Sequence, residues 1–270
     1  MYSRTTMCRL LYYCGKPIKL ESLLINAPNS LFNQSLNNQR NKWFKLLPRD
    51  HMINCDGFGV AWLTNNDFCI YKNTCVPFHD KNIIELAKHI EAPLFVGHLR
   101  AVKNHKNCKV SRDNCHPFKW GKIVFMHNGL ISHFKEYKQK IIALIDKKYH
   151  QYIEGTTDTE CIFFYFLTLL NPTSDQYDCQ HFVRTYLQLL HKLQTKFANS
   201  IISANIIITT PEFTVGSRFI NDETQEPPSL YYNNTTISSE PLYKEGFRLI
   251  EKNMCFYVNH RTQEISFVKI

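Results

Sequence analysis

The stretch Met7-Cys8-Arg9-Leu10-Leu11-Tyr12 decides how the rest of the chain is interpreted. Apolar, β-prone residues follow Cys8, so we predict a strand over residues 8–14. If the mature chain begins at Cys8, this residue carries both a thiol and a free α-amine, which together form a nucleophile with its own base. Their reference pKa values, about 8.5 and about 7.7–8.0, let the amine accept the thiol proton near neutral pH.

Length and composition indicate a globular protein. The chain has 270 residues, of which 44% are hydrophobic and 20% are charged, and this suffices for a core of its own. We expect one domain over residues 7–270, preceded by an extension over residues 1–6. The 10 cysteines include no Cys-x-x-Cys pair, and neither a secretory leader nor an apolar run of about 20 residues is found. We therefore expect reduced thiols, a cytoplasmic location and no membrane partner.

The formal net charge of +9 permits nucleic-acid binding. Lys and Arg are dispersed, however, and no basic run of five or more occurs. We therefore expect no nucleic-acid partner. A basic nucleic-acid-binding module is kept as an alternative, and it would show a steeply salt-dependent affinity.

Hydrophobic periodicity predicts strands on both sides of a helical middle, which indicates an α+β fold with two sheets and helices packed outside them. Residues 26–55 contain few regular patterns and are predicted to form a long loop. His127-Asn128-Gly129 is predicted to be a turn between two short strands. Helices are predicted at 19–25, 82–90, 134–149, 159–170 and 177–197. Strands are predicted at 8–14, 58–62, 68–71, 94–99, 122–126, 130–131, 201–209, 213–219, 230–232, 236–238, 254–259 and 265–270.

Two further segments carry residue types suited to catalysis with Cys8. His98 and Arg100 share one face at the end of a buried strand, where an arginine fork can hold a carboxylate. Asn128 and Gly129 offer an amide side chain and a backbone N–H to a developing oxyanion. Each signal has a simpler interpretation when taken alone, because Arg100 could be a paired structural arginine and Asn-Gly is a common hairpin turn.

Asp158 stands at a predicted helix N-terminus, where it can either cap the helix or hold an ammonium group. Thr157 is the other candidate for the cap. The turn-like segment Asn114-Cys115-His116-Pro117-Phe118, with His105 and Cys108, could suggest zinc. The spacing matches no common paired-ligand pattern, so we expect no metal.

Seven short motifs occur in the order seen in class II glutamine amidotransferases, which the chain therefore resembles. The resemblance is closest to the stand-alone branch that includes the amidotransferase subunit of a cytosolic glutathione-degrading complex. It is dense over residues 7–170 and looser over Ser217-Arg218-Phe219 and Ser239-Glu240-Pro241-Leu242. The motifs are Met-Cys-Arg-Leu-Leu (7–11), Asn-Gln-Ser (33–35), Asp-Gly-Phe-Gly-Val (56–60), His-Leu-Arg-Ala (98–101), Asn-Cys-His-Pro-Phe (114–118), Phe-Met-His-Asn-Gly (125–129) and Gly-Thr-Thr-Asp-Thr-Glu (155–160).

The resemblance implies an N-terminal-nucleophile hydrolase fold, which is a four-layer αββα sandwich with two mainly antiparallel sheets. It implies that Cys8 attacks the γ-amide of glutamine, or another γ-glutamyl group such as that of glutathione, and that the thioester then hydrolyses. No cofactor is implied. A partner hydrolase or an ammonia-accepting subunit is possible.

The resemblance also assigns roles to single residues. Arg100 resembles the residue that holds the substrate α-carboxylate, and Asp158 the one that holds the α-ammonium group. Asn128 and Gly129 resemble the oxyanion-hole pair. His98 and His116 occupy positions that look structural or supporting. We count His98 and Thr157 with Arg100 and Asp158 as substrate-binding candidates.

The sequence departs from the family pattern at two places. Residues 1–6 precede Met7, and with Tyr2 after Met1 we expect the initiator to be kept. Cys8 then needs a start at Met7 or a processing step, and a catalytically inactive γ-glutamyl-binding or scaffolding subunit is the alternative function. Lys103 stands where many relatives carry threonine, which bears on how the substrate carboxylate is held.

Overall fold

The computed structural model describes residues 8–36, 56–102, 110–173 and 177–270. The chain divides into two compact units, each built around one sheet. The first unit comprises the chain up to Pro117 together with Ser229–Leu249, and the second comprises Phe118–Pro228 and Ile250–Ile270. The extension 1–6, residues 37–55 of the predicted loop, Lys103, His105 and Cys108 lie outside the described residues.

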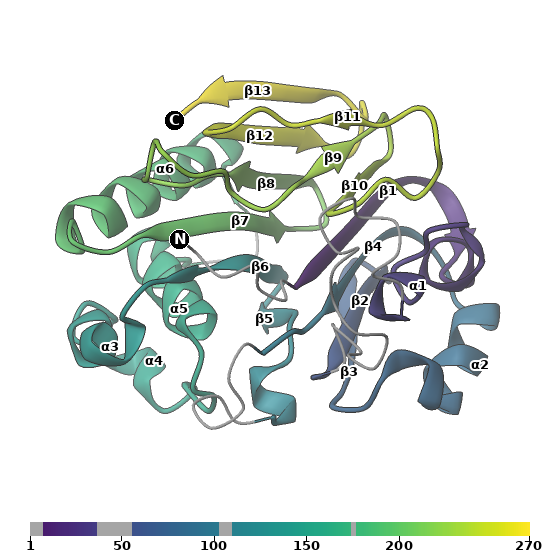
Figure 1. The fold of residues 1–270 in the computed structure, drawn as a ribbon, viewed down its shortest axis with the longest axis horizontal. Coiled ribbons are helices and arrows are strands. Elements are labelled where there is room, and N and C mark those ends of the chain that lie inside the picture. Colours follow the sequence, from purple (N-terminus) through teal and green to yellow (C-terminus); the bar gives the residue numbers. More distant parts are fainter. Residues whose placement is uncertain (1–7, 37–55, 103–109, 174–176) are drawn as a thin grey trace. The chain divides into compact units, whose positions relative to one another are not determined.

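In the described part of the first unit, a seven-stranded sheet has the order β11-β9-β10-β1-β4-β2-β3 (Figure 1). Its strand pairs are antiparallel. The strands are β1 (Arg9–Lys19), β2 (Phe58–Thr64), β3 (Asp67–Asn73), β4 (Glu91–Leu99), β9 (Tyr231–Tyr232), β10 (Thr236–Ser238) and β11 (Arg248–Leu249). The helical segments are η1 (Ser22–Asn26), α1 (Asn33–Leu36), η2 (Pro77–His79), α2 (Lys81–His89) and η3 (Arg112–Asn114).

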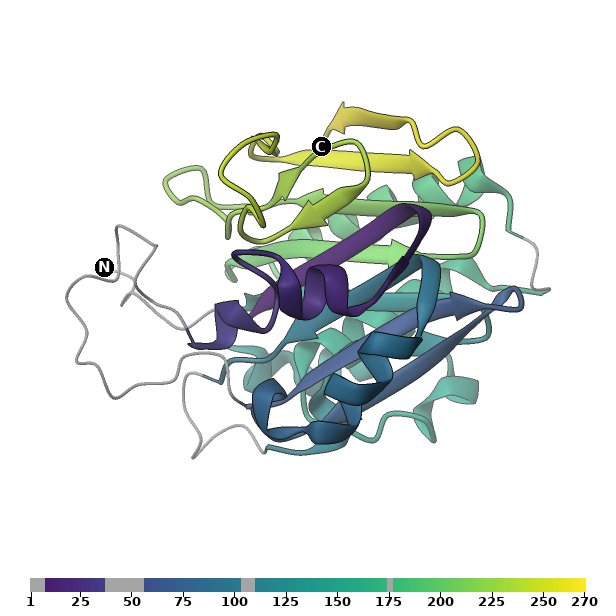
Figure 2. The ribbon, with the colours of Figure 1, turned by 90° about the vertical axis from the view of Figure 1, so that its right-hand side faces the viewer.

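The core of the first unit lies on the face of the sheet that η1 and α2 cover (Figure 2). Asp80 is the N-cap of helix α2, and its carboxylate accepts from the backbone N–H groups of Asn82 and Ile83, which satisfies donors of the first turn. Ile83 and Ala87 lie on its buried face, as the three- and four-residue spacing predicts.

The second unit holds, among its described residues, a six-stranded sheet of order β13-β12-β8-β7-β6-β5 with antiparallel pairs. Helices α5 and α6 cover one face of this sheet (Figure 1). The strands are β5 (Phe118–Trp120), β6 (Ile123–Ile131), β7 (Ile202–Thr209), β8 (Phe213–Arg218), β12 (Met254–Asn259) and β13 (Ile265–Lys269). The helices are α3 (Phe134–Ile142), α4 (Lys147–His150), α5 (Asp158–Leu170) and α6 (Cys179–Lys196).

Strand alternation assigns the two faces of this second sheet. Phe125, Ala204 and Val215 belong to the core cluster that the helices cover, so residues one step away along each strand face the other side. Asn128 therefore lies on the face away from α5 and α6, while its neighbour His127 contacts Thr159 of α5.

Most predicted elements are confirmed, and the α+β class with two mainly antiparallel sheets is among them. The predicted turn at 127–129 is wrong, because β6 runs unbroken from Ile123 to Ile131 and pairs with β7 from Val124 to Ile131. The predicted helix 134–149 is two helices, α3 and α4. The Asp146 carboxylate accepts from the Lys148 N–H and so caps the N-terminus of α4. No helix among the described residues is long and apolar enough to cross a membrane.

Candidate active site

Cys8 directly precedes β1 and is half-buried. Its sulfur lies 3.4 Å from the backbone nitrogen of Ala101, which donates to it, and 3.9 Å from the Ala101 carbonyl oxygen. This contact follows from the strand register, because Arg9 of β1 lies opposite Leu99 of β4. The predicted nucleophile therefore lies beside the residue that follows Arg100.

The first residue of β1 is held by residues that sequence reasoning did not single out. The Arg9 guanidinium donates to the Cys8 carbonyl at 3.3 Å and forms an ion pair with Glu240 at 3.3 Å. Leu10 donates its N–H to the Ser239 hydroxyl at 2.9 Å, and the Ser239 N–H donates to the Leu10 carbonyl at 2.9 Å. The Ser239-Glu240 part of the looser motif match was the signal that could have identified this support.

Arg100 follows β4 and is 3% exposed. Its N–H donates to the Gly57 carbonyl at 2.8 Å, and its guanidinium lies 3.4 Å from the Asp56 carbonyl oxygen. The Asp56 carboxylate accepts from the Val102 N–H at 2.7 Å. Asp56 and Gly57 thus hold the backbone at Arg100 and Val102. These contacts fix the position from which the Arg100 side chain extends.

His98 is fully buried, and its ring lies on that of His116 with the centroids 4.0 Å apart. Gly59 lies opposite His98 on the neighbouring strand, and a Cβ at Gly59 would lie 2.2 Å from the His116 carbonyl oxygen. A side chain there would displace the His116 backbone. The arrangement fits a supporting role for the histidine pair, and substrate binding by His98 stays a prediction.

Asn128 and Gly129 lie inside β6, opposite Asn205 and Ala204 of β7. Asn128 is 2% exposed, and its carboxamide makes no hydrogen bond within the described part of the chain. A Cβ at Gly129 would lie 1.9 Å from the Ser203 carbonyl oxygen. Only glycine therefore fits this position while β6 and β7 stay paired.

Asp158, the first residue of α5, ties that helix to the end of β6. Its carboxylate accepts from the Ile131 N–H at 2.8 Å with one oxygen and from the Thr159 N–H at 2.8 Å with the other. Because each carboxylate oxygen can accept more than one hydrogen bond, these contacts leave acceptor capacity for an ammonium group.

Thr157 is the N-cap of α5, and its hydroxyl accepts from the Glu160 N–H at 3.4 Å. The buried Glu160 carboxylate reaches back to the N–H groups of Glu154 and Gly155, at 3.0 and 2.8 Å. These bonds satisfy donors before the helix as a capping box does. The cap assignment is therefore confirmed for Thr157, and its contact with substrate stays a prediction.

His127 joins β6 to both β7 and α5. Its Nε2 lies 3.0 Å from the Ser203 carbonyl, which can only accept, so Nε2 carries the proton. Its Nδ1 lies 3.0 Å from the Thr159 hydroxyl. These two contacts fix the strand at Asn128 relative to the start of α5 at Asp158.

The other cysteines divide by burial. Burial raises the pKa of the Cys115 thiol, which Arg100 and Lys72 partly oppose, and raises those of Cys161 and Cys255 to about 12. These thiols stay protonated at neutral pH and act as packing groups. Cys69, in contrast, is exposed.

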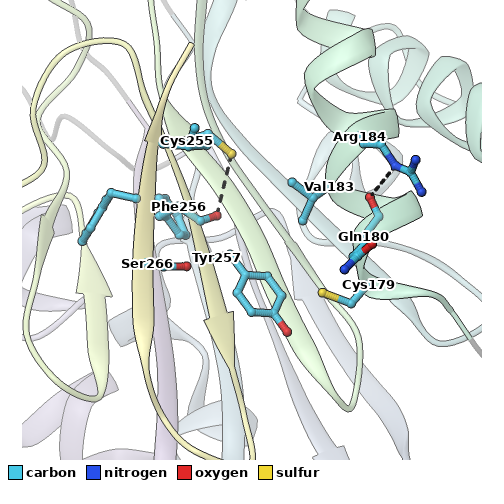
Figure 3. Close-up of a pocket in the computed structure, with 10 residues that line it drawn as sticks. Cys179, Gln180, Val183, Arg184, Cys255, Phe256, Tyr257 and Ser266 are labelled. Carbon is cyan, nitrogen blue, oxygen red and sulfur yellow. Dashed lines mark hydrogen bonds between the residues drawn. The ribbon is translucent and has the colours of Figure 1, made fainter.

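A separate cavity of about 460 Å³ lies within the second unit between α6 and strands β12 and β13. Figure 3 shows Cys179 and Val183 on the helix side and Tyr257 on the strand side. No site candidate lines it. The residues that the structure describes contain no cluster of three or more His, Cys, Asp or Glu side chains suited to a metal ion.

The comparisons with known proteins bear on the family. A family model described as "Glutamine amidotransferases class-II" matches residues 43–208. The curated protein "Probable glutamine amidotransferase DUG3" of Saccharomyces cerevisiae is 31% identical over 251 residues, which cover 84% of this chain and 68% of that protein.

Solved structures share the fold. A glutamine aminotransferase class-II domain protein from Silicibacter pomeroyi is 19% identical, with a TM-score of 0.65 over 97% of this chain and 99% of its own. The glutamine phosphoribosylpyrophosphate amidotransferase of B. subtilis is 11% identical, with a TM-score of 0.58 over 97% of this chain and 49% of its own. The predicted N-terminal-nucleophile hydrolase fold is confirmed by this likeness. The chain belongs to the class II glutamine amidotransferases.

Proposed function

We propose that the protein hydrolyses a γ-glutamyl amide through a thioester on Cys8, with glutamine or a γ-glutamyl peptide such as glutathione as the substrate. The observation that carries the proposal is the contact of the Cys8 sulfur with Ala101, directly after the buried Arg100. A nucleophile beside an arginine can attack an amino-acid substrate whose α-carboxylate the arginine holds.

In the proposed first half-reaction, the α-amine of a mature chain beginning at Cys8 takes the thiol proton. The sulfur then bonds to the γ-carbonyl carbon. Negative charge moves to the carbonyl oxygen, where the Asn128 carboxamide and the Gly129 N–H donate to it. The tetrahedral intermediate collapses, the C–N bond breaks, and the α-ammonium returns its proton to the leaving amine.

In the proposed second half-reaction, water attacks the thioester with the α-amine as base, and glutamate leaves as the Cys8 thiol forms again. Arg100 and Asp158 hold the α-carboxylate and α-ammonium groups throughout. We propose Thr157 and His98 as further contributors to substrate binding. The released amine diffuses away or passes to a partner subunit, and we place the reaction in the cytoplasm.

Glutamate release from glutamine and from glutathione tests this proposal, with Cys8→Ala as the matched variant. We expect the variant to lose at least about 10⁴-fold in kcat, because a nucleophile and its base act as a unit. Turnover by Cys8→Ala equal to that of the unaltered chain would falsify the nucleophile assignment.

Mass spectrometry of the N-terminus should accompany every assay. We expect turnover to track the fraction of molecules that begin at Cys8, since only these carry the free amine. A fully active preparation that retains residues 1–7 contradicts the amine as base. An inactive preparation that begins at Cys8 and still binds glutamine supports the non-catalytic alternative instead.

A further inference from the structure

Asn205 lies in the middle of β7, between Ala204 and Ile206, and is 0% exposed. Its Nδ2 donates to the Pro228 carbonyl oxygen at 2.7 Å. Its Oδ1 is buried and has no hydrogen-bond partner among the described residues. Burying an acceptor without a partner is unfavourable, so this oxygen calls for an explanation.

The orientation of the Asn205 carboxamide is fixed by its neighbours. A carbonyl oxygen can only accept, so the group facing Pro228 is the NH₂ group and the oxygen points elsewhere. The Pro228 carbonyl also accepts from the Arg218 Nε at 3.0 Å. Arg218 donates in addition to the Ile250 carbonyl and to Glu226. The carbonyl that Asn205 contacts is therefore also held by Arg218.

Asn128 is the residue directly opposite Asn205 across the β6–β7 pair. Opposed residues project to the same face with Cβ atoms about 4.5–5.5 Å apart, within reach of one hydrogen bond between two carboxamides. Both residues face away from α5 and α6, because Phe125 and Ala204 are the residues turned towards those helices.

Asn128 needs such an orienting partner. A carboxamide that turns by 180° presents its oxygen in place of its NH₂ group, and an oxygen would repel a developing oxyanion. The NH₂ group has two donors, of which the oxyanion needs one. Within the part of the chain that the structure describes, the Asn128 carboxamide makes no hydrogen bond.

We infer that Asn205 is a positioning residue for the proposed amide hydrolysis: when substrate is bound, its Oδ1 accepts one N–H of Asn128 and leaves the second N–H aimed at the oxyanion. This inference rests on the proposed function, and it deepens the role assigned to Asn128. The single acceptor of Asn205 selects one of the two orientations of the carboxamide.

A double-mutant cycle tests this role. Asn205→Leu keeps the size of the side chain and removes the acceptor, while Pro228 keeps the hydrogen bond from Arg218. We expect kcat of the full chain to fall about 10-fold and KM to change less than about 2-fold, since the lost interaction belongs to the transition state. In an Asn128→Ala background the same substitution should change kcat less than about 2-fold. An equal loss in both backgrounds overturns the inference.

Ser217→Ala is the matched control, because Ser217 is a buried polar residue of β8 whose hydroxyl contacts Tyr186 on the helix-covered face. We expect it to lower the unfolding temperature with kcat unchanged. If Ser217→Ala reduces kcat as much as Asn205→Leu does, loss of sheet stability explains the effect and the inference fails.

A crystal structure of the Cys8→Ala chain soaked with glutamine gives a readout that needs no turnover. An Asn205 Oδ1 within about 3.2 Å of the Asn128 Nδ2 supports the inference. An Oδ1 bonded to any other donor overturns it, whether or not glutamine is present. Whether glutamine occupies the region of Asn128 is a separate observation, and its absence counts against the proposed function alone.

Discussion

The two units hold their catalytic candidates in different ways. In the first unit, Cys8 and Arg100 lie just outside the strand ends, fixed by backbone contacts with Ala101 and Gly57. In the second unit, Asn128 lies inside β6 and is paired with Asn205 of β7. A nucleophile that needs a free α-amine must lie at a chain end, whereas an oxyanion donor gains from a backbone that cannot move.

The largest difference that we expect between the units concerns thiol reactivity. The pKa of about 12 leaves Cys161 and Cys255 of the second unit with a thiolate fraction of about 10⁻⁴ at pH 8. Iodoacetamide should therefore label Cys8 at least about 100-fold faster than either, as followed by mass spectrometry of peptides.

Cys69 provides the internal control because it is exposed. It should react early, and added glutamine should slow labelling at Cys8 and leave Cys69 unaffected. Equal protection of the two thiols would show that glutamine does not cover Cys8, and early labelling of Cys255 would contradict the burial argument.

The next effect concerns the oxyanion donor of the second unit. Asn128→Ala should lower kcat about 10²–10³-fold with KM little changed, because the donor acts on charge that exists only in the transition state. Initial rates over a range of glutamine concentrations separate the two parameters. A rise in KM with unchanged kcat would instead make Asn128 a residue that binds the ground state.

The first unit was the easier one to predict, because its signals are local. The glycines of the Asp56-Gly-Phe-Gly motif mark a turn and a close approach, and the structure shows both: Gly57 has φ +123°, and Gly59 leaves room for the His116 carbonyl. The second unit holds one such local signal as well, the cap at Thr157, since a cap depends on residues three positions away.

The second unit shows where local signals fail. Asn128-Gly129 favours a turn by composition, but continuous pairing with β7 keeps it extended. The partner strand lies more than 70 residues away in sequence, so no window around Asn128 contains the deciding information. Asn205 escaped notice for the same reason, because its importance depends on which residue lies opposite. The resemblance located the candidate residues, and the register supplied their surroundings.

In the first unit, Arg100→Lys should raise KM for glutamine about 10-fold with a smaller change in kcat. Lysine keeps the charge and loses the planar fork that binds a carboxylate at two points. Arg112→Lys is a suitable control, since Arg112 is an exposed residue of the same unit. If Arg100→Lys changes mainly KM while Asn128→Ala changes mainly kcat, the first unit holds the substrate and the second stabilises the transition state. Equal changes in kcat alone would contradict a substrate-holding role for Arg100.

The smallest effect that we expect is on stability and concerns His260 of the second unit. Its Nδ1 donates to the Pro211 carbonyl at 3.0 Å, and its Nε2 accepts from the Thr214 hydroxyl at 2.8 Å. Burial lowers the pKa of His260 to about 4, against an opposing contribution from the Pro211 hydrogen bond. A neutral ring suits both contacts, because protonated Nε2 cannot accept.

The sign of the resulting pH dependence follows from proton binding. Between about pH 4 and the unperturbed value of about 6.5, the unfolded chain binds a proton at His260 that the folded chain does not. This contribution to stability is therefore present above that window and is lost as the pH falls through it. Denaturant unfolding of His260→Gln should show a shallower dependence on pH there, by at most about 1.4 kcal/mol per pH unit, the limit for one proton. His191→Gln, at an exposed position of the same unit, is the control and should show the same dependence of the unfolding free energy on pH as the unaltered chain. If the unaltered chain and both variants show the same dependence, His260 has the same pKa in the folded and unfolded states, which contradicts the prediction.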